Sequence, residues 1–139
     1  MKTVKYENFP DCAKKIRKKV FIEEQGFQNE YDDTDNTAVH FVLFDENEMP
    51  VATCRVFRDA GKASYVLGRL AVLKEYRHKN IGSLLIREAE AYVRSAGGKS
   101  LVLHSQCQAA DFYRKSGFTE YGDIEDEQGC PHIWMRKPL

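Results

Sequence analysis

Hydrophobic positions along the chain follow two periods, one typical of strands and one typical of helices. Apolar, β-branched and aromatic residues dominate several short segments, which end at turns rich in Asp, Asn, Gly and Pro. This pattern predicts strands over residues 2–6, 37–44, 50–57, 64–73, 99–105, 118–121 and 132–136. The last two are expected to be joined by an acidic turn, DIEDEQGCP.

Helical spacing appears in three other segments. Asp11 is a helix start signal, and Ala13, Ile16 and Val20 then recur at helical intervals in a helix that ends before Gly26. The clearest helix covers residues 81–96, and a short one covers 109–116. The polar, acidic residues 26–36 form a loop or another short helix. Together these elements predict an α/β fold of the α+β type, in which about four helices flank a mixed, mostly antiparallel sheet of about six or seven strands.

Length and composition limit the class of protein. A chain of 139 residues predicts one domain, residues 1–139. Lys plus Arg equals Asp plus Glu, which argues against a nucleic-acid-binding protein. No apolar run has the length of a signal peptide or a membrane span, so we expect a cytoplasmic protein without a membrane partner. The four cysteines are scattered, which predicts neither disulfides nor a metal site.

A strand that leads into a helix through a basic connection carries the first chemical signal. The expected strand ends near Leu73, and a helix opens near Asn80 after Arg77, His78 and Lys79. The start of a helix presents unpaired backbone N–H groups and the positive end of its dipole, which bind phosphate oxygens. Gly68, inside the preceding strand, is typical of a β-bulge or of close approach by a ligand. This stretch therefore predicts a phosphate-binding turn.

The same stretch resembles the acyl-CoA signature of the GNAT superfamily of N-acetyltransferases. That signature is Gln or Arg, two residues, Gly, one residue, then Gly or Ala. Here it reads Arg77, His78, Lys79, Asn80, Ile81 and Gly82. Asn80 replaces the first glycine, and Asn tolerates a left-handed backbone better than most residues. Residues 68–72 resemble the family's fourth strand, and residues 109–118 resemble its C-terminal helix and strand.

Both ends of the chain narrow the resemblance. Residues 20–26 (VFIEEQG), the Asp32 and Asp35 pair, and residues 129–135 (GCPHIWM) are similar to the small bacterial ElaA-like and YjcF-like branch of the superfamily. Acceptors in that branch are generally unassigned. The resemblance implies an acetyltransferase that uses acetyl-CoA as co-substrate and a small-molecule or peptide amine as acceptor. By analogy, the late strands could pair in a homodimer.

The resemblance also implies which residues contact coenzyme A. Backbone groups around the strand end would pair with the pantetheine arm, and an N–H near Leu70 or Ala71 would bind the thioester carbonyl. The helix start would hold the diphosphate. The implied contacts are Leu70, Ala71, Val72, Arg77, His78, Lys79, Asn80, Ile81, Gly82, Ser83, Gln106 and Phe112.

Direct transfer needs an acid for the leaving thiolate and a base for the acceptor ammonium. Tyr113 matches the family tyrosine that protonates the thiolate. The candidate bases are Glu23, Glu24, Asp32, Asp35, His40 and His132, with Glu24 and His132 as the leading pair and a chain of water molecules as an equal alternative. His104 is expected to be structural. A covalent intermediate on Cys107 lacks a base partner and is disfavoured.

The acceptor and the exact activity stay open at this level. Acidic residues between positions 23 and 35 would favour a cationic amine if they face the substrate, but a solvated acidic loop is the simpler explanation. The pattern Arg17-x-x-Val20-Phe21 followed by Glu30-x-Asp32-x-x-Asp35 also resembles acyl-homoserine-lactone synthases. A third possibility is a non-catalytic module that binds acyl-CoA as a sensor.

Overall fold

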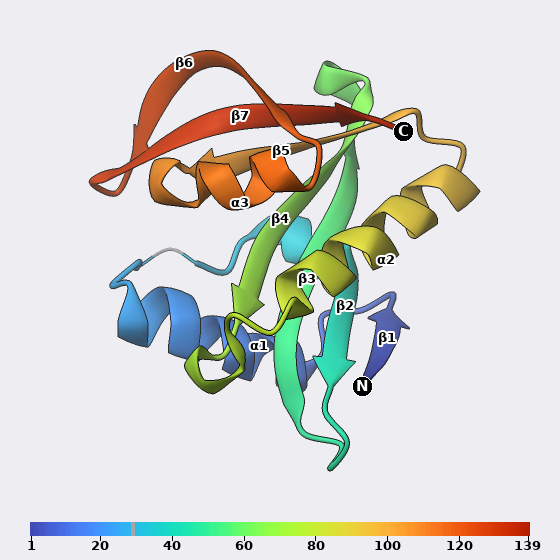
Figure 1. The fold of residues 1–139 in the computed structure, drawn as a ribbon, viewed down its shortest axis with the longest axis vertical. Coiled ribbons are helices and arrows are strands. Elements are labelled where there is room, and N and C mark those ends of the chain that lie inside the picture. The colour runs from blue at the N-terminus through green and yellow to red at the C-terminus, as the bar shows by residue number, and fades with distance from the viewer. Residues whose placement is uncertain (29) are drawn as a thin grey trace.

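A seven-stranded sheet organises the residues that the computed structural model describes, 1–28 and 30–139. Its strand order is β1-β2-β3-β4-β5-β7-β6 (Figure 1). The strands are β1 (Lys2–Tyr6), β2 (Val39–Phe44), β3 (Pro50–Asp59), β4 (Ser64–Val72), β5 (Ser100–Gln106), β6 (Thr119–Glu127) and β7 (Cys130–Pro138). All neighbouring pairs are antiparallel except β4 and β5, which are parallel. The predicted mixed, mostly antiparallel sheet is thus confirmed.

The described part of the chain contains three α-helices, one fewer than the expected four. They are α1 (Asp11–Arg17), α2 (Ile81–Ser95) and α3 (Ala110–Lys115). A π-helix, η1 (Lys18–Glu24), continues α1, so the helical segment still ends before Gly26 as predicted. Short 3-10 turns complete the secondary structure: η2 (Asp33–Asn36), η3 (Ala60–Lys62), η4 (Lys74–Tyr76) and η5 (Cys107–Ala109).

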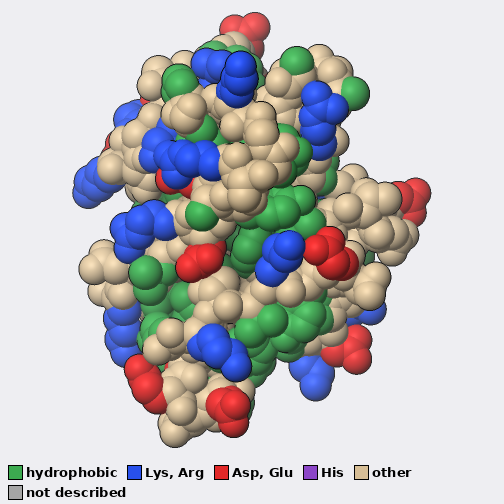
Figure 2. Space-filling view, turned by 90° about the vertical axis from the view of Figure 1, so that its right-hand side faces the viewer, with side chains coloured by type: hydrophobic (Ala, Val, Ile, Leu, Met, Phe, Trp, Pro, Cys, Tyr) green, Lys and Arg blue, Asp and Glu red, His purple; other side chains and the backbone are tan. Residues whose placement is uncertain are grey.

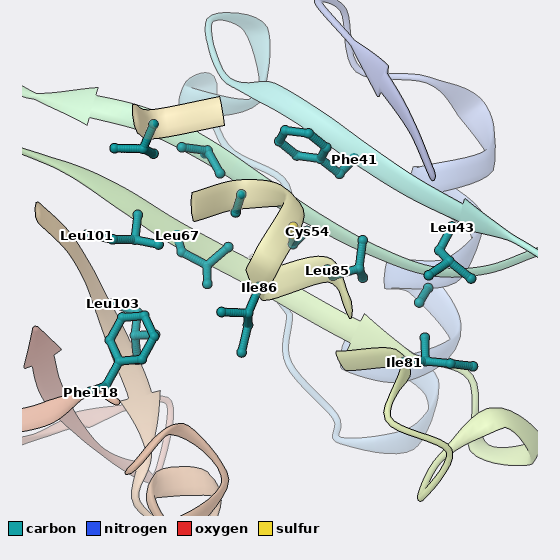
Figure 3. Close-up of a cluster of buried hydrophobic side chains, with 14 of the residues drawn as sticks. Phe41, Leu43, Cys54, Leu67, Ile81, Leu85, Ile86, Leu101, Leu103 and Phe118 are labelled. Carbon is teal, nitrogen blue, oxygen red and sulfur yellow. The ribbon is translucent and has the colours of Figure 1, made fainter. Parts of the chain in front are cut away.

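The sheet buries apolar side chains on both faces, because successive residues of a strand point to opposite sides. On one face, Leu85, Ala89 and Val93 of α2 pack against Leu67 and Leu101 (Figures 1 and 3). On the other face, a second cluster joins α1 to the sheet; it comprises Ala13, Ile16, Val20, Val42 and Ala71. Helices therefore cover β2, β3 and β4 from both sides.

The expected acidic turn between the last two strands is wrong, because most of it is strand. β6 runs to Glu127, β7 starts at Cys130, and only Gln128 and Gly129 form the turn. Both have positive φ, 52° and 81°, which suits a tight two-residue hairpin. The acidic segment is exposed on the outer strand and lacks apolar alternation, so its sequence resembles a loop. The longer hairpin places additional side chains beside the end of β5.

The described helices and one face of the surface have the following properties. No helix there is long and apolar enough to cross a membrane. On the face that carries α2, basic and acidic side chains are interspersed (Figure 2). The same residues contain no group of three or more His, Cys, Asp or Glu arranged for a metal ion.

Candidate active site

The parallel strands β4 and β5 separate partway along their length and open a cavity in the sheet. Residues 65–67 of β4 pair with residues 101–103 of β5, and the two strands diverge beyond them. A cavity of about 610 Å³ is lined by Gly68, Arg69 and Leu70 from β4 and by His104, Ser105 and Gln106 from β5. Backbone groups on the facing edges of the separated strands can pair with an extended ligand, as an added strand would.

Side chains from both faces of the sheet reach this cavity. Leu67 and Leu103 belong to the core beneath α2, and Tyr113 of α3 packs against the same core. By alternation along the strands, the other face presents a different set of side chains to the cavity. These are Arg55, Phe57, His104, Gln106, His132 and Trp134, together with Phe21, Gln25 and Phe27 from the segment after α1. A donor on one face and an acceptor on the other could therefore meet at the gap between the strands.

A β-bulge in β4 forms one edge of the gap. Thr53 pairs with Ala71 and Arg55 with Gly68, so Arg69 and Leu70 together oppose a single residue of β3. The bulge that Gly68 predicted is confirmed, but the left-handed residue is Arg69, with φ of 52°. A non-glycine residue adopts this conformation only where its surroundings hold it there.

A buried ion-pair network supplies those surroundings. Arg69 Nε donates to the carbonyl oxygen of Glu30 at 3.1 Å and lies 3.0 Å from Glu30 Oε1. Glu30 in turn accepts from Arg17 Nε at 2.7 Å, and Arg17 Nη1 donates to Asp35 at 2.7 Å. Arg55 bridges Asp32 at 2.6 Å and Asp35 at 2.9 Å. The loop before β2 is thereby fastened to the bulge.

This network explains the acidic residues of the 26–36 segment. Burial alone would raise the pKa of Asp35, but hydrogen bonds and charge attraction from Arg17, with hydrogen bonds from Asp32 N–H and Arg55, lower it to about 2. Burial would raise the pKa of Asp32, but the hydrogen bond from Arg55 and the charges of Arg55 and Arg69 lower it. Carboxylates paired in this way are poor bases. Recognition of a cationic amine by this segment stays a prediction.

Two histidines line the opposite wall of the cavity. The His104 ring stacks on Trp134 with centroids 4.5 Å apart, and His132 lies 5.0 Å from His104. His104 was expected to be structural, yet it faces the cavity. Burial lowers the pKa of His104 below its ordinary value, despite the raising effect of Glu127, so its ring is neutral at pH 7.

The geometry of His132 fixes its tautomer. Its Nδ1 lies 2.8 Å from the carbonyl oxygen of Cys130, which can only accept, so Nδ1 carries a proton. In the neutral ring, the lone pair is then on Nε2, which lies 3.7 Å from Glu127 Oε2. The side chain is only 7% exposed. His132 can accept a proton at Nε2, and Glu127, which sequence reasoning missed, can stabilise the resulting cation.

Tyr113 approaches the cavity from the α3 side. Burial raises the pKa of its hydroxyl above the ordinary value for tyrosine, and the nearby Cys54 thiol adds to this effect. The phenol is therefore fully protonated at neutral pH and available as a hydrogen-bond donor. Its ring is fixed by edge contacts with Phe112 and Phe118, at 5.0 Å and 6.0 Å between centroids.

The start of α2 has the backbone geometry of an anion site. Asn80 adopts the left-handed conformation that the sequence predicted, with φ of 63°, and His78 does the same. No side chain caps this helix end, and Leu84 N–H donates to the Asn80 carbonyl oxygen at 3.1 Å. The N–H groups of Ile81, Gly82 and Ser83 precede that bond and have no acceptor within the helix. The Ile81 side chain itself is buried in the core, so only its backbone can serve a ligand.

Packing against Phe112 explains why residue 82 is a glycine, a reason that the sequence alone did not reveal. A Cβ built at this position would lie 2.9 Å from Cζ of Phe112, closer than real Cβ contacts allow. Glycine therefore leaves room for the Phe112 ring of α3 at the start of α2, independently of any phosphate. Phe112, expected to contact coenzyme A, is held against the donor loop by this contact.

Arg77 and Glu24 were assigned to different tasks from the sequence, but the structure joins them. Arg77 Nη1 and Nη2 each donate to a Glu24 carboxylate oxygen at 2.6 Å, and Arg77 Nε donates to the Val72 carbonyl oxygen at 2.9 Å. The hydrogen bond from Arg77 lowers the pKa of Glu24. Glu24 does not line the cavity, so the structure does not bring it to the place where a base would act.

Of the remaining predicted residues, one lines the cavity and the others lie outside it. Gln106 lines the cavity, donates from Nε2 to Gln25 Oε1 at 2.8 Å, and accepts from Gln108 at 2.6 Å. His40, another candidate base, is wholly buried away from the cavity, and its Nε2 bonds the Asp35 carbonyl oxygen at 2.9 Å. His78 and Lys79 are exposed beside the α2 start.

Comparison with known proteins agrees with this geometry. The sequence model of the Acetyltransferase (GNAT) domain matches residues 5–139. The chain is 31% identical over 125 residues to YjcF of Bacillus subtilis, which is described as an uncharacterized N-acetyltransferase. The aligned region covers 88% of this chain and 87% of YjcF. The protein therefore belongs to the GNAT acetyltransferase family.

Solved structures share the whole fold. The Escherichia coli ElaA structure matches with a TM-score of 0.86 at 22% identity over 99% of each chain. An aminoglycoside 6'-N-acetyltransferase matches with a TM-score of 0.78 at 16% identity, covering 99% of this chain and 97% of that one. That enzyme's structure is a complex with coenzyme A. The predicted likeness to the ElaA-like and YjcF-like branch is confirmed.

Proposed function

We propose that the protein is an N-acetyltransferase that moves an acetyl group from acetyl-CoA to a primary amine by direct transfer. The observation that carries the proposal is the cavity at the β4–β5 gap, with Tyr113 on one side of the sheet and His132 on the other. Family membership makes acyl-CoA the natural donor. A donor and an acceptor that meet at this gap would each have one proton-transferring side chain nearby.

Binding of the acetyl-CoA donor would depend mainly on backbone groups. Leu70, Ala71 and Val72 would pair with the pantetheine arm along the open edge of β4, and an N–H at the bulge would bind the thioester oxygen as charge develops on it. The uncapped start of α2 would hold the diphosphate. The residues of that loop are Arg77, His78, Lys79, Asn80, Ile81, Gly82 and Ser83, with Gln106 and Phe112 at its borders.

The transfer itself needs three proton movements. The acceptor arrives mostly as an ammonium, whose pKa is about 10, and loses a proton to His132 Nε2. The neutral nitrogen attacks the thioester carbon, the C–S bond breaks, and the sulfur leaves with the electron pair. Tyr113 donates its hydroxyl proton to that sulfur. The attacking nitrogen, which carries a positive charge once it is bonded to carbon, loses its second proton as the amide forms, and that proton restores the Tyr113 phenol.

His132 is the better base of the two leading candidates. Its Nε2 carries the lone pair, it lines the cavity, and Glu127 stands behind it. Glu24 instead neutralises Arg77 at the donor loop. No sequence feature assigns a covalent role to Cys107, and direct transfer needs none.

The resemblance to acyl-homoserine-lactone synthases has a simpler explanation. Arg17, Glu30 and Asp35, which carry that pattern, form one buried ion-pair network that fastens a loop to β4. In this protein the pattern therefore has a structural role, which gives no support to that reaction.

The test is acetyl-CoA turnover against a pooled library of amines, with release of the coenzyme A thiol as the readout. We expect thiol release that depends on both the enzyme and an amine, and loss of most of it in Tyr113→Phe. Coenzyme A binding by calorimetry without thiol release from any amine would contradict the proposal and favour a sensor.

A further inference from the structure

The carboxylate beside the proposed base belongs to an exposed strand. Glu127 is in β6, at the edge of the sheet, and its side chain is 52% exposed. Its Oε2 lies 3.7 Å from His132 Nε2, which carries the lone pair of the neutral ring. A carboxylate and a lone pair repel one another, so His132 cannot hold Glu127 in place before a proton arrives. A long, exposed side chain also gains rotamer freedom by turning into the solvent.

His104 supplies the restraint that Glu127 needs. Its Nδ1 lies 3.1 Å from Glu127 Oε1, so the two oxygens of one carboxylate face two different imidazoles. An ionised carboxylate can only accept, so the hydrogen of this bond is on His104 Nδ1. The His104 ring is itself fixed, because it stacks on Trp134 with centroids 4.5 Å apart. With Oε1 bound to His104, Oε2 is directed toward His132.

The second nitrogen of His104 is unsatisfied. Nε2 is buried and makes no hydrogen bond to any described residue, although Glu125 Oε1 lies 3.2 Å away. The tautomer explains this contact, since a ring with its only proton on Nδ1 presents a lone pair to Glu125. A second proton would let Nδ1 donate to Glu127 and Nε2 donate to Glu125. The structure is therefore prepared for an imidazolium that is not populated at neutral pH, because burial lowers the pKa of His104.

We propose that His104 is a positioning residue for the base His132 and that a second proton on His104 switches this base off. The inference rests on the proposed acetyltransferase function. Neutral His104 holds Glu127 so that Oε2 can accept Nε2–H of His132 once that ring has taken the acceptor proton. In the imidazolium form, the charge of His104 offsets that of Glu127, which then favours a cation on His132 less. The second positive ring also repels that cation, because the two ring centroids are only 5.0 Å apart.

The charges around His104 suit such a switch. The titratable groups that face the ring are Glu125 and Glu127 from β6 and His132 from β7. Behind the stacked ring, Lys62 Nζ lies 3.8 Å from the centroid of Trp134. Across the cavity, the arginines already have carboxylate partners: Arg55 with Asp32 and Arg69 with Glu30. A proton on His104 therefore acts mainly on the two β6 carboxylates and on His132.

The first test compares two substitutions of His104 at pH 7. His104→Phe keeps an aromatic ring on Trp134 but removes both nitrogens, whereas His104→Asn still offers an N–H toward Glu127. We expect kcat to fall about tenfold in His104→Phe, a smaller loss than that of the base itself, and to fall less in His104→Asn. KM for acetyl-CoA should change little. Asp123→Asn, an exposed carboxylate of β6 that does not line the cavity, is the control. Full kcat in His104→Phe would overturn the inference.

A double-mutant cycle separates positioning from an independent structural role. If His104 acts through Glu127, then His104→Phe should cost almost nothing further in a Glu127→Gln background. Losses that multiply in the double variant would overturn the inference. Calorimetric affinity for coenzyme A and the melting temperature show whether each of the four proteins is folded, so the comparison is made between folded enzymes.

The pH profile tests the switch itself. Toward low pH, wild-type activity should be lost through protonation of both His132 and His104, but His104→Asn has only the first of these. The fall of kcat/KM should therefore be steeper in the wild type by about one power of proton concentration. Ionisation of the acceptor contributes equally to both proteins, so the difference belongs to His104. Equal steepness would overturn the inference and leave the acetyltransferase standing, whereas no thiol release from any amine by the wild type would overturn both.

Discussion

The carboxylate of Glu24 accepts hydrogen bonds from both terminal nitrogens of Arg77 at 2.6 Å. These bonds link the end of the first helical segment to the loop before α2. This pair joins a residue expected to serve the acceptor to one expected to serve the donor. A diphosphate at the start of α2 would have to share Arg77 with Glu24 or take it over. The pair therefore makes donor binding depend on the position of the helical segment that borders the acceptor cavity.

Removing this competition should strengthen coenzyme A binding. In Glu24→Gln the Arg77 guanidinium loses its charged partner, so a diphosphate gains an unshared cation. Because the pair is partly exposed, the effect is worth about 0.2–1 kcal/mol, a gain in affinity of a few-fold. Calorimetric Kd values for coenzyme A would measure it, with Glu23→Gln as the neighbouring control. Weaker binding in Glu24→Gln would show instead that Glu24 orients Arg77 for the phosphate.

Tyr113→Phe should lower kcat and leave KM for acetyl-CoA nearly unchanged. The substitution removes the hydroxyl and keeps the ring that packs on Phe112 and Phe118. Loss of a general acid costs about 10²-fold or more in rate. Since burial raises the pKa of Tyr113, the wild-type rate should show no decline from its ionisation up to pH 10. Full turnover by the variant at every pH would remove Tyr113 from the mechanism.

His132→Asn tests the base while preserving its anchor. The Asn amide can donate to the Cys130 carbonyl oxygen much as His132 Nδ1 does, but it offers no atom equivalent to Nε2. We expect kcat/KM at pH 7 to fall about 10²-fold. The deficit should shrink at higher pH, because the neutral fraction of the acceptor grows about tenfold per pH unit below its pKa of about 10. A constant deficit at all pH values, with an unchanged melting temperature, would argue for a binding role.

The sequence predicted local features of this site better than long-range ones. Gly68 indicated the bulge and Asn80 the left-handed turn, because both depend on backbone conformation near one residue. The pairing of Arg17 with Asp35 and of Arg55 with Asp32 depends on contacts between distant segments, which no local pattern reveals. From the sequence, Glu30, Asp32 and Asp35 are therefore expected to face the solvent or the substrate, whereas the structure pairs them with arginines.

The sequence predicts only part of the arrangement of His104, His132 and Trp134, which line one wall of the cavity. His104 alternates with Leu103 and Ser105, so its side chain had to leave the core face of β5. The same alternation places His132 and Trp134 together on β7. Only the register of β5 with β7, in which His104 pairs with Trp134, brings the three onto one wall. The register could not be deduced, because the acidic residues of β6 concealed the length of the hairpin.

Asp35 should make the fold sensitive to acid. Its pKa is about 2 in the folded protein and 3.8 in the unfolded chain, so its ionised form favours folding. That contribution, about 2 kcal/mol, is complete above pH 4 and is lost as the pH falls toward 2. Asp35→Asn should lower the free energy of unfolding at pH 7 by about 3–5 kcal/mol, since it leaves Arg17 buried with an incomplete partner. Urea unfolding at several pH values would measure both effects, and exposed Asp33→Asn should change neither.

Gly82 offers a way to separate packing from phosphate binding. In Gly82→Ala the new Cβ would lie 2.9 Å from the Phe112 ring, so the ring or α3 must shift, at a cost of about 1–3 kcal/mol in stability. The double variant Gly82→Ala with Phe112→Leu removes the clash and should regain much of the stability that the glycine substitution alone loses, compared with Phe112→Leu. Thermal unfolding would measure this coupling, and calorimetry would follow coenzyme A affinity in the same four proteins. Affinity that recovers together with stability assigns Gly82 to packing. Affinity that stays low in a stable double variant assigns it to close approach of the diphosphate as well.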